Sequence, residues 1–283
     1  MFVEKTDNRN QPVKNLRNVR HIILDLDGTI YNGRTLFPFI KDFLDDLKKL
    51  QIGYTFLTNN SSLSVAAYIR KLRQMGLPVK PTQVYTSAQA TIDYLQRHYP
   101  AIKRIYLIGT RSLKHEFTAN GFTVVGNDPI DEPEAVIVGF DTSLTFRKLC
   151  HAAYWIKTGK LFLATHPDRI CPTDQDTILV DCGAVCAALK AATGKKPSAV
   201  LGKPDPSMIK GIMQRFGLKK QEVAIVGDRL YTDIKMARQA GIASILVLSG
   251  ETTRTDLQRS PILPDYVLEN VGELSEILIQ SRK

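Results

Sequence analysis

Residues 22–29 read Ile-Ile-Leu-Asp-Leu-Asp-Gly-Thr, a short apolar run that leads into two carboxylates spaced two residues apart. An apolar run without alternating polar residues is typical of a strand buried on both faces, as in a parallel sheet. Three further segments repeat this arrangement, with apolar runs at 54–57, 199–201 and 223–226 that lead into Thr58-Asn59-Asn60, Gly202-Lys203-Pro204 and Gly227-Asp228. Ligands of open α/β sheets bind beyond the carboxyl ends of the strands, so we expect the four segments to form one site.

Helical patterns separate these apolar runs along the chain. Residues 39–51 carry Leu44, Leu47 and Leu50 on one face and charged residues on the other, and Gly53 ends that helix. We predict further helices over residues 61–75, 87–98, 113–120, 144–158, 183–192, 206–216 and 232–240. Strands are predicted over residues 21–24, 54–57, 104–108, 135–138, 161–164, 199–201, 223–226 and 244–248. The alternation of strands and helices indicates an α/β fold on a parallel sheet.

Composition and charge exclude several classes of protein. The chain has 283 residues, of which 43% are hydrophobic and 23% charged, which rules out collagen-like, coiled-coil and wholly disordered chains. No apolar stretch approaches the ~20 residues that cross a bilayer, so we expect no membrane partner. The net charge of +10 favours anionic partners, but basic residues form no run of five and no aromatic residues are interleaved with them. We therefore expect no nucleic-acid partner.

The N-terminal residues and the number of cysteines both bear on where the protein is located. Residues 1–20 are polar and basic with no apolar segment, so they do not resemble a secretory signal. Four cysteines are too few for a disulfide scaffold at this length. A cytoplasmic location is expected.

The polar residues at the predicted strand ends indicate phosphoryl chemistry. The carboxylates are Asp25, Asp27, Asp228 and Asp233. Each segment alone is also typical of helix caps and turns, but carboxylates that occur together repel one another unless a cation joins them. Mg²⁺ fits best, because it takes oxygen ligands from one or two carboxylates and from substrate phosphate. One carboxylate can then attack phosphorus while the other transfers protons, and Lys203 can stabilise the phosphoryl oxygens.

These segments, in this order, resemble the four motifs of the haloacid dehalogenase (HAD) superfamily, most closely those of its NagD-like, p-nitrophenyl-phosphatase-like branch. The matching segments are residues 25–29 (Asp-Leu-Asp-Gly-Thr), 58–60, 202–204 and 227–233 (Gly-Asp-Arg-Leu-Tyr-Thr-Asp). The resemblance extends over residues 20–283 and includes 164–168 (Ala-Thr-His-Pro-Asp) and 181–184 (Asp-Cys-Gly-Ala). It implies a Rossmann-like core and, because true dehalogenases lack the second aspartate, a phosphatase.

The resemblance also implies a role for each motif residue. Asp25 would be the nucleophile and Asp27 the general acid and base, while Lys203 would steady the nucleophile and the transferring group. Asp228 would coordinate Mg²⁺ together with the Asp25 carboxylate and the Asp27 carbonyl. Asp233 would support the metal through a hydrogen bond or a water molecule.

Three residues are expected to bind the phosphate. Thr58 and Asn59 are assigned to it by the resemblance, and Gly28 is a residue that lets the backbone come close to a phosphate. The resulting hypothesis is a Mg²⁺-dependent phosphatase that hydrolyses a small phosphorylated metabolite through an aspartyl-phosphate on Asp25. Two alternatives remain, a phosphotransferase or mutase with the same chemistry, and a non-catalytic receiver-like or nucleic-acid-binding module.

A long insertion separates the second motif from the third. From Thr58 to Lys203 is 203 − 58 = 145 residues, far more than βαβ connections of about 30 residues require. The excess has its own βα pattern, so we predict a core of residues 1–86 and 191–283 and an inserted α/β domain over residues 87–190. The resemblance implies that this insertion is a cap that closes over the site. It also makes a homodimer the expected assembly.

The segment after the predicted strand 161–164 supplies the candidate substrate residues of the cap, His166, Asp168 and Arg169. A solvent loop rich in turn residues is an equal alternative. Residues 173–176 also hint at a polar ligand. Sugar phosphates, nucleotides and p-nitrophenyl phosphate all remain open as substrates.

Four other residues of the insertion have structural interpretations. Asp181 is expected to cap the helix that follows it. Cys182 and Cys186 are expected to be buried free thiols, because no second Cys/His pair with zinc-site spacing accompanies them. Trp155 is expected to pack in the core.

Overall fold

The computed structural model describes residues 4–5, 14–128, 130–171 and 177–282. In it the chain forms two compact units. The first unit contains Met1–Thr58, Leu72–Val84 and Pro204–Lys283, and the second contains Asn59–Lys71 and Tyr85–Lys203. Asn59 is thus the first residue of the second unit, and Lys203 is its last. The predicted limits of the inserted domain, residues 87–190, stay a prediction.

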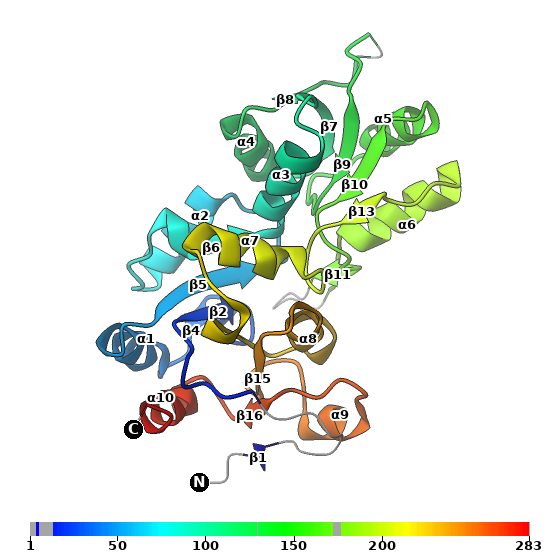
Figure 1. Cartoon of the computed structure of the whole chain (residues 1–283). Helices are drawn as coiled ribbons and strands as arrows, with labels where there is room; N and C mark the ends of the chain where they lie inside the picture. Colours follow the sequence, from blue (N-terminus) through cyan, green and yellow to red (C-terminus); the bar gives the residue numbers. More distant parts are fainter. Residues whose placement is uncertain (1–3, 6–13, 129, 172–176, 283) are drawn as a thin grey trace. The chain divides into compact units, whose positions relative to one another are not determined.

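A seven-stranded sheet forms the centre of the first unit, in the order β1-β16-β15-β14-β2-β5-β6, and only the first residue of β6 belongs to this unit (Figure 1). Its strands are β1 (Glu4–Lys5), β2 (His21–Asp25), β5 (Gly53–Thr58), β6 (Val84–Thr86), β14 (Val223–Gly227), β15 (Ala243–Val247) and β16 (Tyr266–Leu268). The ladders that join β5, β2, β14, β15 and β16 are all parallel. Every residue of β2, β14 and β15 is buried, which explains their predominantly apolar sequences.

Helices with one apolar face pack around this sheet. They are α1 (Ile40–Lys49), α7 (Ser207–Phe216), α8 (Lys235–Ala240), α9 (Arg254–Arg259) and α10 (Gly272–Gln280), and a π-helical turn, η3 (Leu230–Ile234), precedes α8. Two 3₁₀ turns, η1 (Pro81–Gln83) and η2 (Lys220–Glu222), and a hairpin of β3 (Tyr31–Asn32) and β4 (Thr35–Leu36) complete the unit. In α1 the buried residues are Ile40, Phe43 and Leu47, a spacing that places them on one side of the helix.

The second unit has a five-stranded sheet of its own, in the order β13-β10-β9-β7-β8. Its strands are β7 (Arg104–Ile108), β8 (Thr123–Val124), β9 (Ala135–Val138), β10 (Leu161–Ala164) and β13 (Ala199–Val200), all paired in parallel. Its helices are α3 (Ser87–His98), α4 (Arg111–Ala119), α5 (Phe146–Lys157) and α6 (Cys182–Thr193), and α2 (Val65–Gln74) begins in it. β11 (Ile170–Cys171) and β12 (Leu179–Val180) form a small antiparallel pair.

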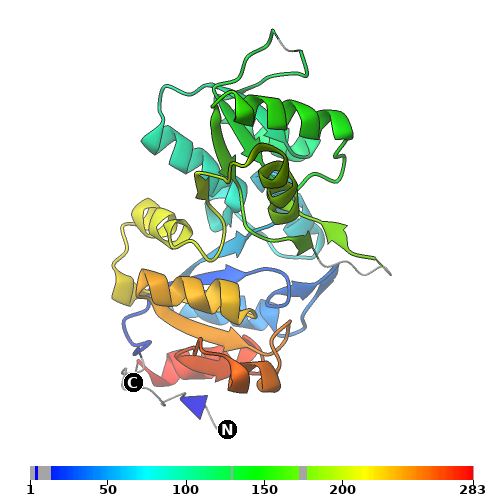
Figure 2. The same cartoon turned by 90° about the vertical axis from the view of Figure 1, so that its right-hand side faces the viewer.

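Alternate residues of β7 show how this second sheet is covered on both faces. Ile105 and Leu107 pack in one apolar cluster with residues of α3 and α4. Tyr106 and Ile108 pack in the other with residues of α5 and α6, which include Trp155. Helices therefore lie on both sides of the strands (Figure 2), the α/β layering that the sequence predicts.

The α/β fold on parallel sheets is thus confirmed, as are three details of the second unit. Asp181 caps α6 and accepts a hydrogen bond from the Cys182 amide. Cys182 and Cys186 are buried free thiols. Trp155 is buried in the core. Among the described residues no helix combines the length and the apolar character needed to cross a membrane.

Candidate active site

Two neighbouring strands of the first unit bring its motif aspartates together. Val226 of β14 lies opposite Leu24 of β2, so Asp228, just after β14, lies one level beyond Asp25, the last residue of β2. Asp233 returns to the same place from η3. One carboxylate oxygen from each of Asp25, Asp228 and Asp233 lies within 4.8 Å of the other two, and we call these three residues the acidic cluster.

The carboxylates of the acidic cluster are buried close together, so their negative charges repel one another. Burial, and then the neighbouring carboxylates of Asp25 and Asp233, raise the pKa of Asp228 to about 8. One oxygen of Asp228, Oδ2, accepts a hydrogen bond of 2.7 Å from the Glu251 amide, whereas Oδ1 is buried without a hydrogen-bond partner. The neighbouring guanidinium of Arg229 pairs with Glu251, with 2.9 Å between Nε and Oε2. An oxygen-rich site of this charge is matched to a hard cation.

Two glycines allow the backbone to approach Asp228. Gly28 has φ +81°, and a Cβ on it would lie 2.4 Å from Oδ2 of Asp228. A Cβ on Gly250 would lie 2.1 Å from the same oxygen. The Ser249 hydroxyl donates a hydrogen bond of 2.7 Å to the Gly28 carbonyl, which joins these two backbone segments. Gly250 and Glu251 are not among the predicted site residues, although they follow a predicted strand as the other motif residues do.

Two further motif residues of the first unit lie near the ends of the same strands. Thr58 is the buried last residue of β5, and its predecessor Leu57 pairs with Asp25. The Asp27 side chain is exposed and accepts a hydrogen bond of 3.3 Å from the Tyr31 hydroxyl. Its carboxylate is therefore accessible to solvent, in contrast with the three carboxylates of the acidic cluster. The roles assigned to these residues stay predictions.

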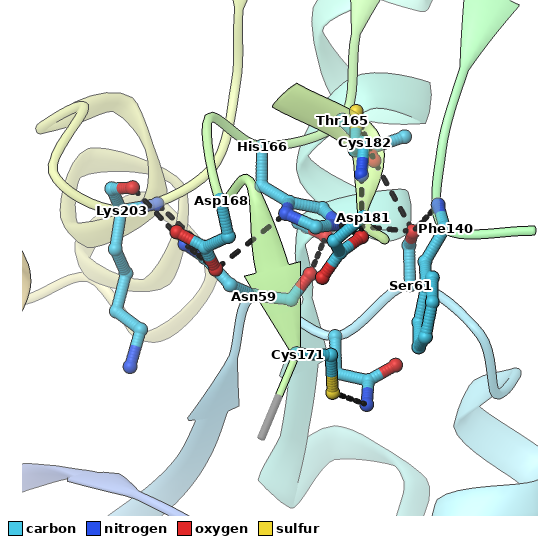
Figure 3. A network of polar contacts seen from close by, with 12 residues as sticks. Asn59, Ser61, Phe140, Thr165, His166, Asp168, Cys171, Asp181, Cys182 and Lys203 are labelled. Atoms are coloured by element: carbon cyan, nitrogen blue, oxygen red, sulfur yellow. Dashed lines mark hydrogen bonds and ion pairs between the residues drawn. The ribbon is translucent and has the colours of Figure 1, made fainter. Parts of the chain in front are cut away.

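A second group of motif residues lies in the second unit, around the side chain of Asn59 (Figure 3). Its Oδ1 accepts a hydrogen bond of 2.7 Å from the Lys203 amide. Its Nδ2 donates to the Lys203 carbonyl and to Oδ2 of Asp168, each at 3.0 Å. His166 lies between Asp168 and Asp181, with 3.5 Å from Nδ1 to Asp168 Oδ2 and 3.5 Å from Nε2 to Asp181 Oδ1. We call these five residues the His166 network.

The charges in the His166 network balance within the protein. Burial on its own would lower the pKa of His166, but Cys182, Asp168 and Asp181 outweigh it and raise that pKa to about 9. Burial on its own would raise the pKa of Asp168, but His166, Asn59 and the charge of Lys203 together outweigh it, so that pKa is lowered. His166 is therefore an imidazolium between two carboxylates at neutral pH.

The candidate substrate residues differ in accessibility. His166 is fully buried, the Asp168 side chain is 18% exposed, and Arg169 is exposed. The assignment of all three to substrate binding stays a prediction. Residues 173–176, which also hinted at a polar ligand, lie outside the described residues. The burial of His166 could not be predicted from local sequence, since its contacts with Ser61 and Asp181 come from distant segments.

Comparison with known proteins decides the family. A family model of haloacid dehalogenase-like hydrolases matches residues 22–123, and a HAD-hydrolase-like model matches residues 200–274. The acid sugar phosphatase of Staphylococcus epidermidis is 33% identical over 91% of this chain and 97% of its own length. The chain belongs to the haloacid dehalogenase-like hydrolases.

Solved structures place this HAD hydrolase within the family. The 4-nitrophenylphosphatase of Thermotoga maritima is 42% identical, with a TM-score of 0.88 over 93% of this chain and 98% of that one. NagD of Escherichia coli is 32% identical, with a TM-score of 0.81 over 90% and 98%. The magnesium complex of a glycerol phosphate phosphatase from Mycobacterium tuberculosis is 30% identical, with a TM-score of 0.84 over 93% and 79%. The chain is a phosphatase of the NagD-like branch.

Proposed function

We propose that this HAD phosphatase is Mg²⁺-dependent and hydrolyses small phosphomonoesters through an aspartyl-phosphate formed on Asp25. The observation that carries the proposal is the acidic cluster, in which a buried oxygen of Asp228 has no hydrogen-bond partner. Three buried carboxylates within 4.8 Å of one another are costly for a protein that binds no cation there. The magnesium in the related glycerol phosphate phosphatase structure agrees with this interpretation.

The residues present fit Mg²⁺ in donor type and in charge. Oxygens of Asp25 and Asp228 would hold the ion together with the carbonyl of Asp27, and Asp233 would support them. When bound, Mg²⁺ would neutralise charge on the cluster and on the phosphate. The backbone around Gly28 leaves space for the Asp228 carboxylate at this point.

Asp25 and Asp27 divide the chemical work. A carboxylate oxygen of Asp25 attacks phosphorus, and the bond from phosphorus to the leaving alkoxide oxygen breaks. Asp27 gives its proton to that oxygen and later takes a proton from the water that hydrolyses the aspartyl-phosphate. Its exposure and its contact with the Tyr31 hydroxyl suit a group that exchanges protons with bound molecules.

The phosphoryl oxygens need donors and positive charge throughout this exchange. We assign Thr58, Asn59 and Gly28 to phosphate binding and Lys203 to stabilisation of the nucleophile and the transferring group. Residues 87–190 form the proposed cap over the site, with His166, Asp168 and Arg169 as its proposed substrate residues. Sugar phosphates and polyol phosphates are the first substrates to test, because relatives are an acid sugar phosphatase and a glycerol phosphate phosphatase.

Hydrolysis of p-nitrophenyl phosphate with and without Mg²⁺ tests the proposal. We expect turnover that requires Mg²⁺, and a loss of about 10⁴-fold in kcat for Asp25→Asn, because an amide is a poor nucleophile. Inorganic phosphate should accumulate in step with nitrophenol, whereas phosphate on an added acceptor would indicate a phosphotransferase. Full turnover by a folded Asp25→Asn protein would reject Asp25 as the nucleophile. Sedimentation of the wild type would test the predicted homodimer.

A further inference from the structure

The main chain of Lys203 is held at two points by one side chain. Asn59 accepts a hydrogen bond from the Lys203 amide at 2.7 Å and donates one to the Lys203 carbonyl at 3.0 Å. These two bonds satisfy the donor and the acceptor of that residue's backbone, and they join the first and last residues of the second unit. Figure 3 shows that the Lys203 side chain extends away from Asn59. These two hydrogen bonds, which we call the Asn59 clamp, therefore fix the main chain of Lys203 and not its ammonium group.

A glycine is required for this close approach. Gly202 precedes Lys203, and a Cβ on it would lie 2.6 Å from Oδ1 of Asn59 and 2.4 Å from Cβ of His166. Both contacts are far shorter than van der Waals separation. The backbone before Lys203 thus packs directly against two members of the His166 network.

Asp168 fixes the orientation of the Asn59 amide. An Asn side chain has two N–H donors, and here one points to the Lys203 carbonyl and the other to Asp168. A carboxylate can only accept at this position, so a flipped amide would place two oxygens against each other. Asp168 thereby keeps Oδ1 of Asn59 directed at the Lys203 amide.

His166 in turn neutralises Asp168. Its ring lies 3.5 Å from the Asp168 carboxylate on one side and 3.5 Å from that of Asp181 on the other. Ser61 also approaches Nε2, at 3.4 Å. Without a positive charge between them, the carboxylates of Asp168 and Asp181 would repel each other, and Asp168 would lose its fixed position.

We propose that His166 is a positioning residue that acts through Asp168 and Asn59 to hold the main chain of Lys203. Because His166 is fully buried, this role replaces its assignment to direct substrate contact, and the exposed Arg169 stays a candidate for that contact. The inference rests on the proposed function, because Lys203 matters for catalysis only if it acts on the phosphoryl group. Small displacements of such a group reduce turnover strongly, by as much as about 10²-fold for 1 Å.

A double-mutant cycle between His166→Gln and Asp168→Ala tests the pathway. Glutamine retains hydrogen-bonding ability but not the charge, and alanine removes the link to Asn59. We expect each variant to lower kcat for p-nitrophenyl phosphate about 10-fold, and the double variant also about 10-fold, because both act through one contact. Independent roles would give about 100-fold for the double variant and would overturn the inference. KM should change less than kcat in each case.

A substitution of Lys203 tests whether the effect of His166 acts through Lys203. In a Lys203→Arg protein the Asn59 clamp remains but the positioned group is already altered, so His166→Gln should cost less than about 2-fold. A further loss of about 10-fold there would overturn the inference. If His166→Gln does not fold, Asp181→Asn replaces it. This variant removes a carboxylate that faces His166 and leaves the contacts of Asn59 unchanged. We expect it to lower kcat slightly in the wild-type background and not to lower kcat further in the Asp168→Ala background.

Matched controls separate positioning from stability and from the proposed function. His151→Gln changes a half-buried histidine of the same unit that stacks on Tyr106, and it should leave kcat unchanged. Fluorescence of Trp155 checks that the second unit is folded in each assay. If Asp25→Asn retains turnover, the proposed function fails. If Asp25→Asn is inactive and His166→Gln is fully active, only the positioning role fails.

Discussion

The acidic cluster and the His166 network both bring carboxylates together in the protein interior, but the charges that surround these carboxylates differ. In the network, an imidazolium and an amide face the carboxylates of Asp168 and Asp181. In the acidic cluster, the carboxylates of Asp25, Asp228 and Asp233 face one another. The network pairs its charges within the protein, whereas in the proposed function a bound cation would neutralise the cluster.

This difference distinguishes a proposed ligand-binding site from a group of residues that positions other residues. A buried charge that is paired internally contributes to position and order, and removing its partner destabilises the fold. A buried charge that lacks a partner costs stability until a ligand arrives, and removing it stabilises the ligand-free fold. The same kind of substitution in the two regions should therefore have opposite effects on stability.

Asp228→Asn should give the largest effect. We expect kcat with Mg²⁺ to fall about 10³-fold, because a metal ligand and its charge are lost. The metal-free protein should become more stable by about 4 kcal/mol at pH 7, because a carboxyl whose pKa is raised from 3.8 to about 8 destabilises the folded state at neutral pH. Asp168→Ala should instead lower stability. Urea unfolding and steady-state kinetics on the same preparations measure both.

Asp42→Asn is the matched control for this experiment. Asp42 lies exposed on α1, so its loss should leave kcat and stability unchanged within about 0.5 kcal/mol. A destabilised Asp228→Asn protein would contradict the view that the acidic cluster is unbalanced. It would show that the Asp228 carboxylate already has its partners within the fold.

Strands and helices with a clear apolar pattern could be predicted from the sequence more accurately than short ones. The predicted bounds of β7, β9, β10 and α3 are those of the structure, because each has a continuous apolar run or a full helical face. The predicted elements do not include β16, α9 or α10. β16 has three residues and α9 has six, and patterns this short do not stand out from the surrounding loops.

The candidate site divides in the same way. The aspartates of the acidic cluster could be predicted because each follows a buried strand, and strand ends of a parallel sheet meet at one edge. The His166 network could not be predicted, because Asn59 and Asp168 are separated by 109 residues and joined by a side-chain contact. Local patterns carry no information on such a pairing.

Added Mg²⁺ should sharpen the contrast between the two regions. Binding to the acidic cluster should stabilise the wild type by about 2.7 kcal/mol when Mg²⁺ is at 100 times its Kd. The ion should stabilise His166→Gln equally, since the acidic cluster is intact in that variant. It should have little effect on Asp228→Asn. Thermal unfolding with and without MgCl₂ measures this, and an equal response in all three proteins would indicate that the ion binds elsewhere.

The His166 network should show its own dependence on pH. The pKa of His166 is about 9 in the folded protein against an ordinary value of 6.5, so its stabilising contribution is full below pH 6.5 and disappears as pH rises through 9. We expect a loss of about 3 kcal/mol over that interval in the wild type. Asp168, Asp181 and Cys182 face the ring and determine this window.

Trp155 provides the measurement for this pH dependence. It is the single tryptophan of the chain and is buried in the second unit, so its fluorescence follows the unfolding of the unit that contains His166. In His166→Gln the decline between pH 6.5 and 9 should flatten. A decline of equal size in wild type and variant would assign the dependence to other groups.

The smallest expected changes in stability come from alanine substitutions at two glycines of the first unit, Gly28 and Gly217. Both have a left-handed backbone conformation. Gly217 ends α7 with φ +64° and has open space where a Cβ would be, so Gly217→Ala should cost about 1 kcal/mol from backbone strain alone. Gly28 has φ +81°, but a Cβ there would also press on Asp228 at 2.4 Å. Gly28→Ala should therefore lose most of the Mg²⁺ stabilisation, whereas Gly217→Ala should retain it. Equal Mg²⁺ responses in the two variants would mean that the position of the Asp228 carboxylate does not matter for binding the ion.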